Sequence, residues 1–259
     1  MPAVELARLE RQIEGLRRGF ADSARLRREV LDLLEFYASR VRPGRTAGRT
    51  AALGVPTAVL RAIETALRAE ARADRHAAAM AGESLWSIPV VEARWLAIAL
   101  LETQEASGLP PWVEAWAHTA DDPALLERLA SGPMRRLLAD APRLFWETIS
   151  AYLASRQVAP ATVALLSLRE AASSLDDGDL PRFFEVLGGA PPTLTGEAWR
   201  AQVDALRAVA RRSPAETARF LVDEISRARP GAARLARQTL EAFPPREREH
   251  LRRTLQAQA

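Results

Sequence analysis

The segment PVVEARWLAIALLETQE, residues 89–105, decides the fold class of this 259-residue chain. Val91, Trp95, Ile98 and Leu101 recur at spacings of three and four, which places them on one face of a helix. The middle of the segment is apolar nearly all the way round, as expected for a helix that packs against neighbours on two sides. We therefore expect a buried helix over residues 89–105.

Most of the remaining chain shows the same helical period, and no segment alternates with a period of two. Prolines mark the predicted helix starts, because their fixed φ suits the first turn and their missing N–H is not needed there. Several starts lie 31 to 37 residues apart, as in one helix-turn-helix unit per interval. The prolines that mark predicted helix starts, at whatever spacing, are Pro56, Pro89, Pro123, Pro142, Pro160, Pro181, Pro214, Pro230 and Pro245. The sequence predicts an all-α fold, an α-solenoid of degenerate HEAT-like helix-hairpin repeats.

The predicted domain organisation follows from one non-helical stretch, residues 42–50. This stretch is basic because it contains several arginines, Arg45 and Arg49 among them. We expect an N-terminal helical cap and basic loop over residues 1–50, and one continuous repeat domain over residues 51–259. Because the repeats share no consensus, a compact irregular helical domain is the alternative fold. Ser213 and Glu216 have the spacing of a capping box, which predicts a helix start between them.

The composition excludes several kinds of chemistry. All 36 basic residues are Arg, against 33 acidic residues, and the chain has no Cys. Disulfides, thiolate zinc sites and cysteine nucleophiles are therefore excluded. The amino terminus has no apolar segment typical of a secretory signal, and the longest strongly apolar stretch, residues 95–101, is too short to span a membrane. We expect a monomeric cytoplasmic protein without a membrane partner.

The near-neutral net charge of +3 conceals an uneven distribution. Residues 1–50 carry 11 Arg and 7 acidic residues, and residues 201–259 carry 12 and 7. Residues 51–130 carry 6 Arg and 11 acidic residues, so the ends of the chain are basic and its middle is acidic. An anionic partner is expected to contact the ends, whereas solvated helix faces without a partner are the alternative interpretation.

No metal or cofactor motif is complete. The stretch 44–50 resembles a phosphate-binding loop only superficially, since it is one residue short and has Arg49 where Lys is needed. Aspartates at 121–122 and 176–179 stand beside Pro or Gly, which favours caps and turns over magnesium ligands. The three histidines are far apart, so we expect no metal and no cofactor. Trp112 and Trp116, one helical turn apart, form an aromatic wall for a base or sugar if exposed; core packing is the alternative.

Two stretches resemble a known family. Leu-Gly-Val-Pro at 53–56, followed by Leu60-Arg61, and Leu85-Trp86 with Pro89, Glu92 and Ala97 are similar to segments of the bacterial DNA alkylation repair proteins, the AlkD-like HEAT-repeat glycosylases. The resemblance extends over about residues 20–230.

The resemblance implies a C-shaped array whose concave basic surface holds duplex DNA. Active members excise N3- or N7-alkylated purines with a carboxylate and aromatic side chains that stabilise positive charge on the sugar. At the family's W-D-x-x-D motif this chain has Pro123 at the Trp position and Glu127 at the final carboxylate position. The family's W-x-x-R position falls at 158–161 without an Arg, and a later aromatic position falls at Asp204. Glu127 is therefore the catalytic residue that the resemblance implies, and the chain departs from the family at the other positions.

We expect a protein that binds double-stranded or branched DNA, with glycosylase activity as an open question. The predicted phosphate contacts are Arg45, Arg49, Arg135, Arg136, Arg169, Arg207, Arg211 and Arg212. The alternative function is a non-catalytic α-solenoid that serves as a protein-interaction scaffold, because such surfaces bind peptides and domains as readily as nucleic acid.

Overall fold

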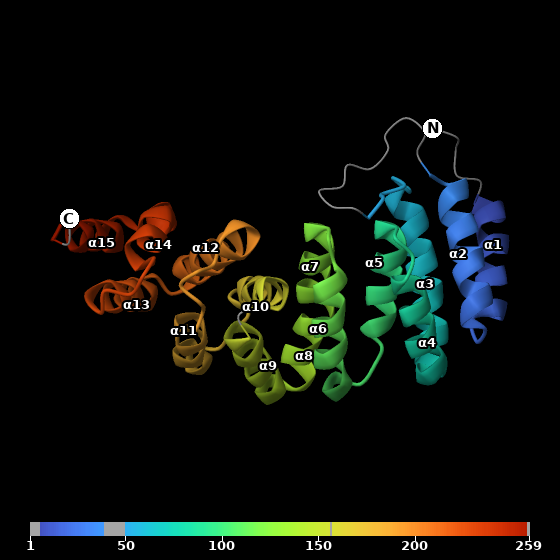
Figure 1. The fold of residues 1–259 in the computed structure, drawn as a ribbon, viewed down its shortest axis with the longest axis horizontal. Coiled ribbons are helices and arrows are strands. Elements are labelled where there is room, and N and C mark those ends of the chain that lie inside the picture. Colours follow the sequence, from blue (N-terminus) through green and yellow to red (C-terminus); the bar gives the residue numbers. More distant parts are fainter. Residues whose placement is uncertain (1–5, 39–49, 156, 258–259) are drawn as a thin grey trace. The chain divides into compact units, whose positions relative to one another are not determined.

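The computed structural model describes residues 6–38, 50–155 and 157–257, and in these residues the protein is all-α, as predicted. An isolated parallel bridge between Ala51 and Val90 is the only extended pairing in the described part. The chain divides into two compact units, Met1–Arg136 and Leu137–Ala259 (Figure 1). The functional division at residue 50 and the C shape remain predictions.

Unit 1 consists of two layers of stacked helices. One layer contains α1, α3, α5 and α7, and the other contains α2, α4 and α6. The helices are α1 (Leu6–Gly19), α2 (Ser23–Phe36), α3 (Thr57–Ala73), α4 (Arg75–Trp86), α5 (Val91–Leu101), a 3-10 turn (Ala106–Gly108), α6 (Leu109–Thr119), α7 (Pro123–Leu129) and a π-helical turn (Ala130–Met134). The next helix, α8 (Arg135–Asp140), begins at the end of this unit.

Unit 2 repeats the layered arrangement. One layer contains α10, α12 and α14, and the other contains α9, α11, α13 and α15. The helices are α9 (Pro142–Ala154), α10 (Val158–Ala171), a 3-10 turn (Asp177–Asp179), α11 (Leu180–Gly188), α12 (Gly196–Arg212), α13 (Pro214–Ser226), α14 (Ala232–Thr239), a 3-10 turn (Leu240–Ala242) and α15 (Pro245–Ala257). Among the described helices of both units, none is long and apolar enough to cross a membrane.

The helix starts follow the local signals in the sequence. Each predicted proline lies within three residues of an observed helix start. Asp22, Asp74 and Asp122 are N-caps whose carboxylates each accept a backbone N–H from the first turn of α2, α4 and α7. Ser213 is the N-cap of α13, so the predicted helix start is confirmed, but its side chain makes no capping hydrogen bond and the predicted capping box is not formed. Its backbone carbonyl instead accepts the Thr217 hydroxyl at 2.7 Å.

Helix α5 is the buried centre of unit 1, and it is shorter than the predicted segment. Nine of its eleven residues are buried, because α3, α4 and α7 all pack against it. Its start is delayed because Pro89 and Val91 pair with Ala51: the Ala51 N–H donates to the Pro89 carbonyl, and the Val91 N–H donates to the Ala51 carbonyl. Glu102 forms the C-cap.

A buried carboxylate at the start of α5 holds the chain segment that precedes α3. Glu92 is 5% exposed and accepts the backbone N–H groups of Leu53, Gly54 and Val55 at 3.1, 2.7 and 3.3 Å. Gly54 has a φ of 69°, a conformation that side chains other than Gly rarely adopt. The turn therefore directs three successive N–H donors toward one carboxylate, and these hydrogen bonds compensate for burial of its charge.

We predict that Glu92→Gln lowers the free energy of unfolding by about 1–3 kcal/mol, because an amide replaces a charged acceptor and its NH2 group faces N–H donors. Urea denaturation followed by circular dichroism measures the change. Glu83→Gln is the control, since Glu83 is exposed on α4 and its replacement is expected to change stability by less than about 0.5 kcal/mol. Equal stability of the two variants would contradict the role of Glu92.

Candidate functional site

The predicted catalytic carboxylate, Glu127, is exposed on α7. Asp122 is the N-cap of helix α7, and its side chain accepts the Ala124 N–H at 2.9 Å. Pro123 is the first residue of the helix. Leu125, Leu126 and Leu129 are buried on the same short helix. The apolar spacing therefore directs Glu127 away from the core and toward solvent.

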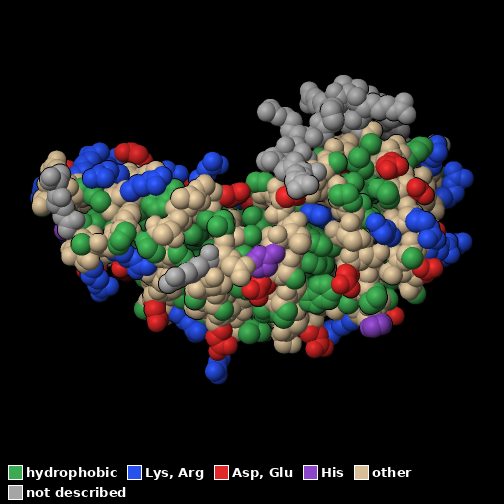
Figure 2. Space-filling view, viewed as in Figure 1, with side chains coloured by type: hydrophobic (Ala, Val, Ile, Leu, Met, Phe, Trp, Pro, Cys, Tyr) green, Lys and Arg blue, Asp and Glu red, His purple; other side chains and the backbone are tan. Residues whose placement is uncertain are grey.

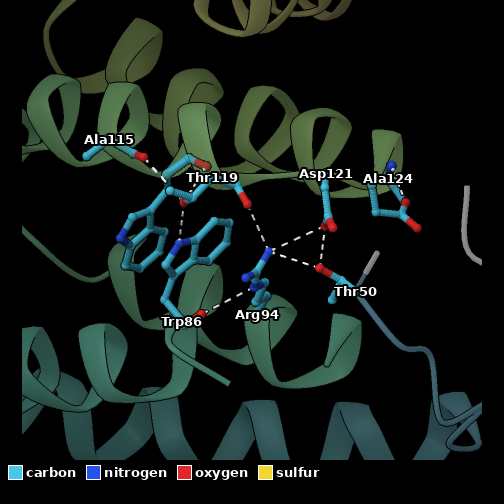
Figure 3. A network of polar contacts seen from close by, with 9 residues as sticks. Thr50, Trp86, Arg94, Ala115, Thr119, Asp121 and Ala124 are labelled. Carbon is cyan, nitrogen blue, oxygen red and sulfur yellow. Dashed lines mark hydrogen bonds and ion pairs between the residues drawn. The ribbon is translucent and has the colours of Figure 1, made fainter. Parts of the chain in front are cut away.

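Arg94 on α5 binds the chain segment that leads into α7 (Figure 3). Its guanidinium donates to the Thr119 carbonyl at 3.0 Å, the Thr50 hydroxyl at 3.1 Å and the Trp86 carbonyl at 3.2 Å. It also pairs with Asp121 at 3.6 Å, and the Thr50 hydroxyl donates to the same carboxylate. One side chain thus connects the chain before α3 with the ends of α4 and α6 and with the residues before α7.

The environment of Arg94 is largely desolvated. Its side chain is 12% exposed, and its guanidinium lies 5.0 Å from the centre of the Trp86 ring. Burial lowers the pKa of Arg94 from its ordinary value, and the charge of Asp121 opposes that shift. The hydrogen bonds and the carboxylate compensate for the buried charge, so Arg94 is a structural element of the site and not a ligand-binding cation.

The two tryptophans predicted to stack on a base differ in their surroundings. Trp116 is 4% exposed and stacks on Trp86, with ring centres 4.6 Å apart and planes 3° from parallel. The Trp86 indole N–H donates to the Thr119 hydroxyl at 2.9 Å (Figure 3). Trp112 is half-buried and meets the ring of Trp116 edge-on at 5.6 Å. Trp116 is therefore part of the packing between α4 and α6, whereas the side chain of Trp112 is partly accessible to solvent.

An ion-pair network spans the layer that carries Glu127. Arg128 donates to both Glu64 oxygens at 2.9 Å, and Arg68 reaches Glu64 at 2.9 Å and Glu102 at 2.6 Å. Burial raises the pKa of Glu102; Arg68 and Arg128 oppose that shift, whereas Glu64 adds to it. The network connects α3, α5 and α7, and it commits both of these arginines to carboxylates.

A π-helical turn after α7 accommodates this network. A Cβ atom added at Gly132 would collide with the Glu102 carboxylate, so a larger residue there would require the Glu102 side chain to move. The turn also contains Pro133, which lacks the N–H that a regular helix uses. The absence of a side chain at Gly132 therefore leaves room for the Glu102 carboxylate that pairs with Arg68, and π-helical turns are frequent at functional sites.

The predicted phosphate contacts of unit 1 are only partly available. Arg135 is exposed at the start of α8. Arg136 donates to the backbone carbonyl of Glu102, which ties it to the network. Arg45 and Arg49 lie outside the described residues. Of the four arginines predicted in this unit, the structure therefore shows Arg135 as exposed.

The predicted contacts of unit 2 fall on different surfaces. Arg169 on α10 pairs with Glu170 at 2.8 Å. On α12, Arg207 is held by Asp204 at 3.2 Å, and Arg211 is exposed. Arg212 pairs with Asp177 at 3.0 Å and lines a groove between α11 and α13. Arg212 thus lines this groove, whereas Arg207 and Arg211 are not among its lining residues.

The described residues contain no group of three or more His, Asp or Glu side chains arranged to hold a metal ion. In general, a carboxylate can stabilise positive charge on a ligand, and guanidinium groups can bind anions.

A family model described as DNA alkylation repair enzyme matches residues 42–240. The chain belongs to this family. The resemblance seen at residues 53–56 and 85–97 is thus confirmed. A search of curated proteins and a search of solved structures each found no match.

The matched segment contains α3 to α14, whereas α1, α2 and α15 lie outside it. Sequence reasoning missed Glu64, Arg68, Glu102 and Arg128 as a set, since their pairing depends on three helices. The one local signal was the Gly132-Pro133 pair, which is unusual inside a run of helix.

We predict that Gly132→Ala lowers the free energy of unfolding by about 1–3 kcal/mol, because the new methyl group displaces the Glu102 carboxylate from Arg68. The double variant Gly132→Ala, Glu102→Ala removes the collision. A double-mutant cycle by urea denaturation should therefore show that Gly132→Ala costs less when Glu102 is absent. An equal cost in both backgrounds would contradict the proposed contact.

Proposed function

We propose that this protein binds duplex DNA through arginines of its helical repeats and acts on alkylated DNA. The observation that carries the proposal is the family match, which spans residues 42–240 and supports a role related to DNA repair. The exposed arginines of α8 and α12 supply the phosphate contacts in this proposal. Such contacts position a duplex without reading its sequence.

The proposed catalytic group is Glu127. Release of an N3- or N7-alkylated purine breaks the bond between C1′ and the base nitrogen, and the base leaves with the bonding electron pair. Positive charge then develops on the sugar, and a water molecule attacks C1′ and loses a proton. The exposed carboxylate of Glu127 is suited to stabilise that charge, and the half-buried ring of Trp112 offers an aromatic surface on the preceding helix.

A second candidate function, a protein-interaction scaffold without catalysis, is favoured by one observation in unit 2. A groove of about 980 Å³ lies between α11 and α13, and the stacked rings of Phe184 and Phe220, 5.1 Å apart, line it. Its rim mixes both charges, which suits a protein surface better than a phosphate chain. A pull-down that yields a stoichiometric protein partner, with no retention of DNA, would favour this function over the first.

We predict that the protein binds duplex DNA with a log–log salt dependence of several units, because each phosphate contact releases counterions with a slope of about 0.9. Fluorescence anisotropy at several salt concentrations measures it, with plain, branched and methylated duplexes tested side by side. A flat salt dependence, or no binding at low salt, would contradict DNA binding.

We predict that Glu127→Gln abolishes release of methylated purines while DNA binding persists, because the amide keeps the shape of the side chain and removes its charge. Release of base from methylated duplex is measured by chromatography. Glu83→Gln on α4 is the matched control and should retain the wild-type rate. If the wild-type protein releases no base, the catalytic part of the proposal is wrong.

A further inference from the structure

Gln238 of α14 connects two arginine-bearing helices in unit 2. Its side-chain oxygen accepts the Trp199 indole N–H at 2.7 Å, and its backbone carbonyl accepts Arg207 at 2.9 Å. Trp199 and Arg207 are both on α12, so one residue fixes two points of α12 against α14. Arg207 therefore has a defined position although its side chain is 44% exposed.

Arg234, on α14, contacts the same tryptophan, Trp199 of α12. Its guanidinium carbon lies 4.3 Å from the centre of the Trp199 ring, and Trp199 itself is 8% exposed. Helix α14 starts after Gly231, whose φ of 86° permits a sharp change of direction next to Trp199. Arg234 and Arg207 are thus both held at one junction between α12 and α14.

A guanidinium that stacks on an aromatic ring keeps its hydrogen-bonding capacity. Stacking uses the face of the planar group, whereas its five N–H donors point outward in the plane. No carboxylate pairs with Arg234 in the described part of the chain, and Arg234 is exposed. Its N–H donors are therefore directed by the Trp199 ring and available to an anion.

The charge around this junction is positive. Arg200, Arg207 and Arg211 recur along one face of α12, and Arg237 follows Arg234 on α14. Arginine side chains gather over these two helices in Figure 2. Within this set, Arg207 pairs with Asp204 of the same helix. In unit 1, by contrast, Arg68, Arg94 and Arg128 are each committed to carboxylates.

We propose that Arg207 and Arg234 form a clamp for a backbone phosphate of duplex DNA, with Trp199 and Gln238 as positioning residues. The inference rests on the proposed DNA-binding function and adds Arg234, which the sequence did not single out. Two guanidinium groups held in place lose little side-chain entropy on binding. Arg234 has no carboxylate partner among the described residues, and Arg207 retains N–H groups beyond the two that donate to Asp204 and to the Gln238 carbonyl. Arg200, Arg211 and Arg237 extend the same positive surface along the strand.

The test compares Arg234→Gln with Arg219→Gln. Arg219 is a matched control because it is exposed on α13, in the other layer of unit 2, and no carboxylate of the described residues pairs with it. Both variants remove one positive charge from an exposed site, and urea denaturation checks that both remain folded. Binding to an unmodified duplex is measured by anisotropy at several salt concentrations.

We expect Arg234→Gln to raise the Kd roughly five- to tenfold at low salt and to reduce the salt slope by about one unit, as for loss of one phosphate contact. Arg219→Gln should leave the slope unchanged. If the two variants bind alike, the clamp is wrong and the DNA-binding function stands. If the wild-type protein itself binds no duplex, the proposed function fails and the clamp fails with it.

Discussion

Two buried charges near the start of α5, Glu92 and Arg94, determine how the rest of unit 1 is arranged. An unpaired charge in the interior costs several kcal/mol, so each requires partners from other segments. Glu92 takes three backbone N–H groups that precede α3, and Arg94 takes polar groups at the ends of α4 and α6 and before α7. Helix α7 and its exposed Glu127 therefore have a position that depends on the core.

Ion pairing distributes the arginines between structural and binding roles. In unit 1, Arg68 and Arg128 neutralise Glu64 and Glu102, so they contribute little field to attract an anion. On α12 and α14 of unit 2, the Trp199 ring lies against Arg234, whereas Arg207 is held by the Asp204 carboxylate and the Gln238 backbone carbonyl. The proposed roles accordingly differ: the proposed catalytic carboxylate is on α7, and the proposed phosphate contacts are on α8, α12 and α14.

The residues that carry the family resemblance turn out to maintain the fold. Glu92 binds the turn at 53–55, Pro89 pairs with Ala51, and Trp86 stacks on Trp116. Such short motifs identify a family because they depend on local geometry, yet they say little about the ligand. The base-stacking role predicted for Trp116 rested only on its spacing from Trp112. In the structure the ring of Trp116 is buried against Trp86.

The sequence by itself determined that the protein is all-α, where its helices start, and its family, because helical period, proline positions and short motifs depend on residues close together in the chain. Only the tertiary structure decided which charges are available. Arg128 finds Glu64 at a separation of 64 residues, and Arg207 finds Gln238 at 31. No local pattern encodes these distances, since they arise when separate helices pack side by side.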